Sequence, residues 1–285
     1  MKILWTLLST VHLVFAETKI AVMETAFGNR CSVESVRLAK ESGYAGVQIH
    51  TGKLEKNDRM SISDPKLQKE FLAASKKHGV EIVSLCAGAM NQIDVTKPGE
   101  ARERGRAVMI QSMNACQKLG CKTLLFPFFG PSGFQKSDEK LEGVAEFLRE
   151  LRPLAEHYGV TIGIESPVTH DRVKQLFKLI WNPECVKMYY DTGNMGRKNE
   201  DIHKALKSFG RKGVCEIHLK PKKGIHFGKN DGTNLSKLAG TLDEIGYNGW
   251  LVFEQGGGVK KGQTELSKEN LKGVKKLASL RKKED

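Results

Sequence analysis

Short apolar runs alternate with longer amphipathic stretches along most of the chain. The apolar runs are nearly continuous, as expected of strands that are buried on both faces of a parallel sheet. We assign eight such strands, at 19–24, 46–50, 80–86, 122–127, 160–165, 186–191, 214–220 and 249–254. The segments that separate them are too long for hairpins and have the length of helical crossovers.

The amphipathic stretches carry helix signals. Asp64 followed by Pro65 is typical of a helix start, and Gly79 is typical of a helix end. We expect helices at 32–43, 64–79, 99–120, 137–159, 170–181, 200–210, 235–246 and 266–281. Strict alternation of eight strands with eight helices predicts an α/β fold, a closed (β/α)8 TIM barrel that forms a single domain. An open doubly wound sheet is disfavoured because the first strand is followed by no G-x-G-x-x-G turn.

The first sixteen residues do not fit the barrel pattern. Lys2 precedes an apolar stretch that ends on Val14-Phe15-Ala16, and small residues at these spacings suit signal peptidase. The stretch is short for a membrane span. We therefore expect a signal peptide at 1–16, a barrel domain at 17–285 and an exported protein, periplasmic or secreted, without an integral membrane segment in the mature chain. An uncleaved anchor and a buried first strand are the alternatives.

Composition and charge agree with one large exported domain. The 285 residues are 39% hydrophobic and 28% charged, which suits a barrel of about 250 residues. The formal net charge is +13, and loss of Lys2 with the leader leaves +12. Such a balance attracts acidic or phosphorylated sugars, acidic glycans, nucleic acid or an anionic surface. Because the lysines are spread along the predicted helices, a solvated basic face also explains them.

Six cysteines remain after export, and none forms a C-x-x-C motif. A structural zinc site is therefore not expected. Cys86 and Cys215 lie in apolar runs, where cysteine behaves as a small hydrophobic residue. We expect mostly buried thiols, and disulfide pairing stays open.

Four consecutive strands end on side chains that bind metals. These are Glu165, Asp191, His218 and Glu254, the second followed by an expected turn at 192–194. In such barrels the carboxyl ends of all strands open on the face that carries the chemistry. Three carboxylates at one point repel each other, and their pKa values rise unless a cation is present. We therefore predict a divalent metal site made of these four residues. Three oxygens and one imidazole suit Mn²⁺, Mg²⁺ or Co²⁺, and Zn²⁺ stays open.

Three further polar residues are candidates for substrate binding. His50 ends the second strand, and Gln48 points the same way because side chains alternate along a strand. Asn194 can hydrogen-bond a substrate hydroxyl. Lys220 can attract an anionic group or polarise a carbonyl, and a salt bridge to a carboxylate on the same face is an equal alternative.

The motifs IES (164–166), YYDTGN (189–194), IHLK (217–220) and GYNGWLVFE (246–254) resemble those of the xylose-isomerase-like barrels known as sugar phosphate isomerases and epimerases. The resemblance covers most of the mature chain and is strongest over 160–256. It implies that Glu165 and Glu254 bind the metal and also move protons at the carbon beside a carbonyl, while the metal stabilises the enediolate.

The chain also departs from part of that family. Ketose 3-epimerases tend to have a histidine where Asn194 stands, and an arginine on the loop where this chain has Lys220, Lys222 and Lys223. The resemblance therefore does not extend to a free ketose as the substrate.

The function expected from these observations is a divalent-metal-dependent isomerase or epimerase of a sugar, keto-sugar or sugar phosphate, in carbohydrate metabolism. A dehydratase or lyase acting on a keto-sugar would use the same enediolate. A nuclease of the endonuclease IV type is disfavoured, because three-metal chemistry needs more ligands, so we expect a small carbohydrate and not nucleic acid as the partner. A non-catalytic sugar-binding barrel and a homo-oligomer stay open.

Overall fold

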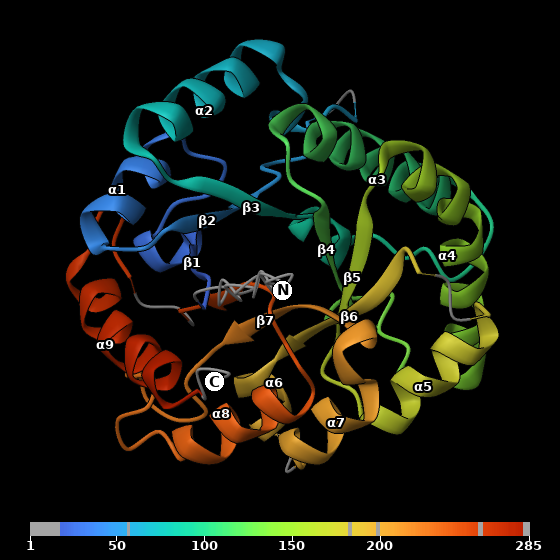
Figure 1. Cartoon of the computed structure of the whole chain (residues 1–285). Helices are drawn as coiled ribbons and strands as arrows, with labels where there is room; N and C mark the ends of the chain where they lie inside the picture. Colours follow the sequence, from blue (N-terminus) through green and yellow to red (C-terminus); the bar gives the residue numbers. More distant parts are fainter. Residues whose placement is uncertain (1–17, 56–57, 182–183, 198–199, 256–258, 282–285) are drawn as a thin grey trace, which may run out of the picture.

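The computed structural model describes residues 18–55, 58–181, 184–197, 200–255 and 259–281. In this part of the chain, eight parallel strands close into a barrel in sequence order, and helices surround it (Figure 1). The strands are β1 Ile20–Met23, β2 Gly46–His50, β3 Glu81–Cys86, β4 Thr123–Pro127, β5 Thr161–Glu165, β6 Val186–Asp191, β7 Val214–Leu219 and β8 Leu251–Phe253. The predicted (β/α)8 TIM barrel is confirmed. The expected signal peptide at 1–16 lies outside the described residues.

Each predicted helix is present, with the expected signals at its ends. The helices are α1 Glu34–Ser42, α2 Pro65–His78, α3 Glu100–Leu119, α4 Asp138–Tyr158, α5 His170–Leu179, α6 Thr192–Arg197, α7 Ile202–Gly213, α8 Leu235–Glu244 and α9 Glu265–Leu280. Short 3₁₀ helices follow three strands, at η1 Glu24–Phe27, η2 Ser61–Ser63 and η3 Gly88–Gln92. The Asp64 side chain caps α2 by accepting from the Lys66 backbone N–H, and Gly79 ends the helix in the left-handed conformation.

The prediction of strictly eight helices, with a turn after the sixth strand, is wrong. Residues 192–197 form the additional helix α6. Its first turn is stabilised by Asp191, whose Oδ1 accepts a hydrogen bond from the Asn194 backbone N–H at 2.8 Å. A carboxylate in front of a helix satisfies an amide that would otherwise lack a partner.

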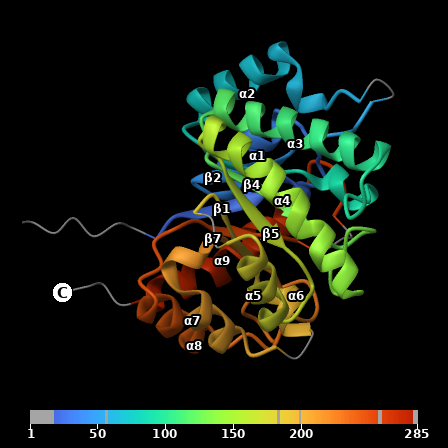
Figure 2. The ribbon, with the colours of Figure 1, turned by 90° about the vertical axis from the view of Figure 1, so that its right-hand side faces the viewer.

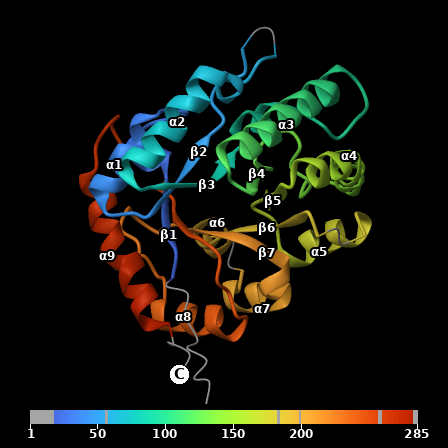
Figure 3. The same ribbon diagram turned by 45° about the horizontal axis from the view of Figure 1, so that its top comes forward.

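The helices pack around the barrel on all sides. In the side view, α2, α3 and α4 lie on one side of the strands, and α5, α7 and α8 lie on the other (Figure 2). The last helix, α9, lies beside α1 (Figure 3), so that the two ends of the described chain close the ring together. The Tyr44 hydroxyl helps to join them by donating to the Ser267 carbonyl at 2.9 Å.

Most apolar side chains pack between the strands and the helices, while a smaller apolar cluster fills the barrel interior. Along each strand, every second side chain points inward. On β7, for example, Glu216 and His218 share the inward direction. The interior therefore carries polar groups immediately below the carboxyl ends of the strands.

The described residues contain no disulfide, and all six cysteines are free. Three of them, Cys86, Cys116 and Cys121, are buried, and the other three are partly exposed. No helix in this part of the chain is both long and apolar enough to cross a membrane.

Candidate metal centre and substrate pocket

The four predicted ligands meet at the carboxyl end of the barrel. One ligand atom from each of Glu165, Asp191, His218 and Glu254 can be chosen so that all four atoms lie within 4.8 Å of one another. Glu165 and Asp191 are the last residues of β5 and β6, His218 lies near the end of β7, and Glu254 directly follows β8. The first three are buried and Glu254 is partly buried. These four residues could hold a metal ion.

The centre is rich in negative charge that two cationic groups partly offset. His218 Nδ1 lies 3.1 Å from Glu254 Oε2 and 3.6 Å from Glu165 Oε1. Lys220 Nζ lies 2.8 Å from Glu254 Oε1 and 3.5 Å from Asp191 Oδ2. Lys220 thus takes the salt-bridge role that the sequence left as an alternative. It lines the substrate pocket at the same time.

These contacts shift the pKa values in opposite directions. Burial favours the neutral form of His218, but the charges of Glu254 and Glu165 outweigh it and raise the pKa of His218 to about 10. Burial also opposes ionisation of Glu254, yet His218 and Lys220 hold the pKa of Glu254 below its usual range. The pKa of Asp191 is raised, first by burial and then by the charge of Glu254.

The donor set fits a divalent ion. His218 Nδ1 and Glu254 Oε2 are buried and form no hydrogen bond with any described residue, although they lie 3.1 Å apart. Two buried polar atoms without a hydrogen-bond partner at the centre of a cluster of ligand-type side chains are what a metal site without its ion would show. On the other side of the ring, His218 Nε2 lies 2.9 Å from Gln48 Oε1. Because an amide oxygen only accepts, Nε2 carries a proton, and Nδ1 is left to face the carboxylates.

A buried hydrogen-bond network fixes the orientation of Gln48. Its amide nitrogen donates to the Ser84 hydroxyl and to the Tyr189 hydroxyl, both at 2.9 Å. These hydroxyls in turn donate to Glu216 Oε2, at 2.7 Å from Ser84 and 2.9 Å from Tyr189. Burial raises the pKa of Glu216 to about 7. The network orients His218 from below, as the outer partners of metal-binding histidines do.

Gln48 could be singled out from the sequence only by its direction, and Ser84, Tyr189 and Glu216 were not predicted. A signal was present, because Ser84 and Glu216 are polar residues inside apolar runs. Glu216 also lies two residues before His218, and therefore on the same side of β7.

The structure places Asn194 against the carboxylates. Its side-chain Nδ2 lies 2.6 Å from Asp191 Oδ2 and 3.4 Å from Glu165 Oε1. Asn194 also lines the pocket, so its predicted role in substrate binding stays a prediction. Its visible contribution is to hold two of the predicted ligands in place.

A cavity of about 500 Å³ opens above the four ligands. The second half of the barrel contributes Glu165, Lys220 and Glu254, and the first half contributes Arg30 and His50. The predicted substrate-binding residue His50 thus lies in the pocket, but it is not one of the four clustered ligands.

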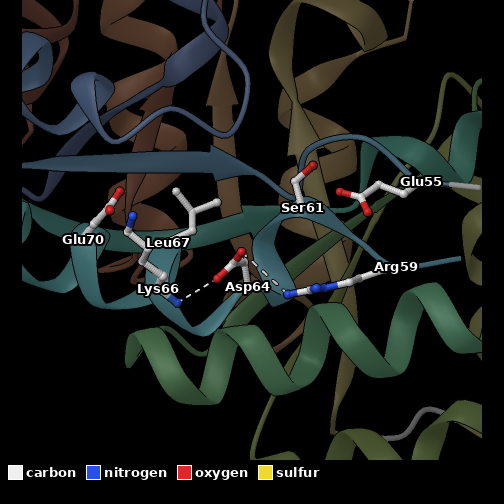
Figure 4. A pocket seen from close by; sticks show the side chains of 7 residues that line it. All are labelled: Glu55, Arg59, Ser61, Asp64, Lys66, Leu67 and Glu70. Atoms are coloured by element: carbon white, nitrogen blue, oxygen red, sulfur yellow. Dashed lines mark hydrogen bonds and ion pairs between the residues drawn. The ribbon is translucent and has the colours of Figure 1, made fainter. Parts of the chain in front are cut away.

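Another hollow, of about 370 Å³, lies beside the start of α2 and is shown in Figure 4. Asp64 is its best-connected charged group. Asp64 accepts from the Lys66 backbone N–H at 2.8 Å and pairs with Arg59 Nη2 at 3.7 Å. None of the predicted site residues lines this hollow.

Comparisons with known proteins agree with the fold. A family model described as xylose isomerase-like TIM barrel matches residues 36–277. A 3-keto-D-glucoside 4-epimerase from E. coli is similar in structure, with a TM-score of 0.72 and 17% identity over 92% of this chain and 100% of that one. An L-ribulose 3-epimerase has a TM-score of 0.74 and 14% identity over 92% and 95% of the two chains.

A D-allulose 3-epimerase from Methylomonas sp., solved in complex with D-allulose, has a TM-score of 0.73 and 14% identity over 93% of this chain and 98% of that one. At such identities the likeness shows the shared fold. A comparison with curated protein sequences finds no match.

Proposed function

Because the chain belongs to the xylose isomerase-like TIM barrel family, we propose that it is a divalent-metal-dependent isomerase or epimerase of a sugar, keto-sugar or sugar phosphate. The observation that carries the proposal is the convergence of Glu165, Asp191, His218 and Glu254 at the carboxyl end of the barrel. Solved structures of similar fold include sugar epimerases, which supports the same reaction class.

In this proposal Asp191 and His218 act as ligands, and Glu165 and Glu254 act as ligands and as proton carriers. The ligand set suits Mn²⁺, Mg²⁺ or Co²⁺, and Zn²⁺ is also compatible. Such an ion would bind oxygens of the substrate and offset the negative charge that develops when a proton leaves the carbon beside the carbonyl.

The positions of the two glutamates support their proposed role in proton transfer. Both approach His218 Nδ1, at 3.6 Å for Glu165 and 3.1 Å for Glu254, and they come from strands separated by two others. One carboxylate would remove the proton and the other would return it. His218 first and then Lys220 lower the pKa of Glu254 against the effect of burial, so this carboxylate is ionised.

Deuterium uptake tests this reaction. The metal-loaded protein is incubated in deuterated water with ketoses, keto-sugars and sugar phosphates, and incorporation beside the carbonyl is followed by NMR. Glu165→Gln and Glu254→Gln should each lower the exchange rate by about 10²- to 10⁴-fold. Glu142→Gln, which alters an exposed residue of α4, should leave the rate unchanged.

Metal content is measured on every variant to separate loss of the ion from loss of the proton carrier. If Glu165→Gln and Glu254→Gln keep both their metal and the wild-type exchange rate, the proposed roles are wrong. If the wild-type protein exchanges no substrate in the panel, the proposed reaction class fails.

We also propose that the protein is exported, on the basis of the apolar leader that ends at Ala16. N-terminal sequencing of the protein recovered from its native compartment should then begin at Glu17. A sequence that begins at Met1 would contradict cleavage.

A further inference from the structure

A buried carboxylate organises the loop that follows β1. Glu24 is fully buried, and it accepts hydrogen bonds from the backbone amides of Cys31, Ser32 and His50 and from the Ser35 hydroxyl. Burial raises the pKa of Glu24, and the four hydrogen bonds oppose that rise. Because a buried carboxylate is costly without such partners, this arrangement holds the loop in one place. It fixes Arg30 next to the end of β2.

At that position Arg30 and His50 direct hydrogen-bond donors toward each other. His50 Nδ1 accepts from the Gly52 backbone N–H at 3.1 Å, so in the neutral ring the proton lies on Nε2. Burial and the charge of Arg30 lower the pKa of His50 to about 4, which keeps the ring neutral at pH 7. Yet His50 Nε2 lies 3.3 Å from Arg30 Nη1, and a guanidinium group has no acceptor. Arg30 Nη1–H and His50 Nε2–H therefore face each other with no acceptor oxygen between them.

Gly88 makes room for the imidazole at this place. A Cβ atom on Gly88 would lie 1.9 Å from His50 Nε2, closer than any side chain tolerates. His50 is only 6% exposed and still lines the pocket above the metal centre. The Nε2 edge of the ring therefore lies against Gly88 and close to Arg30, and all three residues line the pocket.

The charge balance of the pocket leaves Arg30 uncompensated. Among the residues that the structure describes, no carboxylate pairs with Arg30, whose side chain is exposed. At the metal centre, the three carboxylates would balance a divalent ion together with the Lys220 ammonium. The guanidinium of Arg30 then remains as a surplus positive charge at the wall of the pocket, where its planar donors suit a carboxylate or a phosphate.

We propose that Arg30 and His50 bind an anionic group of the substrate, a carboxylate or a phosphate, so that the enzyme acts on an acidic sugar and not on a neutral one. The inference rests on the proposed function, because it defines the substrate class of the same pocket. One oxygen of the anion accepts from His50 Nε2–H and from Arg30 Nη1–H, while the sugar extends toward the four ligands. The flat, forked guanidinium suits both anions.

Three sugars that differ only at carbon 6 test the proposal, namely D-fructose, D-fructuronate and D-fructose 6-phosphate. Their binding to the manganese-loaded protein is measured by isothermal titration calorimetry at low ionic strength. At least one of the two anions should bind about 10- to 100-fold more tightly than D-fructose, as expected for a charge-assisted hydrogen bond. A preference for the uronate or for the phosphate ester identifies the anion.

Arg30→Met should remove this preference and leave the affinities for Mn²⁺ and for D-fructose unchanged. Arg211→Met is the matched control, because Arg211 is exposed at the end of α7, on the opposite face of the barrel. It should keep the full preference. Equal binding of the three sugars, no binding of either anion, or an unchanged preference in Arg30→Met would each overturn the proposal.

The same samples separate this inference from the proposed function. Preferential binding of an anion without deuterium exchange would contradict the isomerase and leave the anion site intact. If D-fructose exchanges as fast and binds as tightly as its acidic counterparts, the result would support the isomerase and contradict the anion site.

Discussion

Binding of a divalent ion should displace a proton from His218. In the metal-free protein the charges of Glu254 and Glu165 overcome the effect of burial and raise the pKa of His218 to about 10. The ring is therefore almost fully protonated at pH 7, yet Nδ1 must lose its proton to become a ligand. About one proton should leave per ion bound, and the affinity should rise about tenfold per pH unit between roughly pH 6.5 and 9. The raised pKa of Asp191, caused first by burial, acts in the same direction.

Calorimetry in buffers of different ionisation enthalpy measures the released protons directly. Manganese is titrated into the metal-free protein at pH 7 in PIPES, HEPES and ACES. The slope of the observed binding enthalpy against the ionisation enthalpy of the buffer gives the number of protons released per ion. His170→Gln should keep the wild-type slope, because His170 pairs with Glu200 at 3.0 Å and is not one of the clustered ligands. A slope of zero, together with an affinity that does not change from pH 6 to 9, would refute the reasoning.

Three other substitutions test the surroundings of the site. Gln48→Leu removes the acceptor that orients His218, so the affinity for Mn²⁺ should fall by about 10- to 100-fold in calorimetry, with an unchanged circular dichroism spectrum. Tyr189→Phe removes one hydrogen-bond donor from the buried carboxylate of Glu216. The free energy of unfolding, measured by guanidinium titration, should fall by about 1–3 kcal/mol. Gly88→Ala places a Cβ atom on the His50 ring. It should abolish the preference for acidic sugars while the affinity for Mn²⁺ stays at the wild-type value.

Each of these expectations has a clear contrary result. Wild-type metal affinity in Gln48→Leu would mean that the amide does not position the imidazole. Unchanged stability in Tyr189→Phe would mean that water or a repacked neighbour replaces the hydroxyl. A Gly88→Ala protein that still prefers acidic sugars would show that His50 is not part of the anion site.

The barrel and its four ligands could be predicted because both follow from short-range rules. Buried parallel strands give continuous apolar runs, and parallel strands place their last residues on one face. Glu165, Asp191, His218 and Glu254 could therefore be recognised from their positions in sequence. Knowledge of which atoms lie together was not needed.

The features that escaped prediction depend on contacts that the apolar and polar pattern does not show. The helix α6 forms where Asp191 caps a segment that is too short for a periodic pattern. The placement of Arg30 depends on Glu24, which joins the loop after β1 to the end of β2. Ser84 and Glu216 stand out as polar residues in apolar runs, but the sequence does not show which polar side chains hydrogen-bond to one another across the barrel.

The four candidate metal ligands all lie at or near the ends of β5 to β8, whereas Arg30, His50 and Gly88 come from the segments around β1 to β3. The proposed metal chemistry and the proposed substrate selectivity are thus encoded in different halves of the gene. A chimera that receives its N-terminal half from a relative should therefore change its substrate preference and keep the same four candidate metal ligands. Gln48 is the residue that such a graft must preserve, because its amide reaches across the barrel to His218.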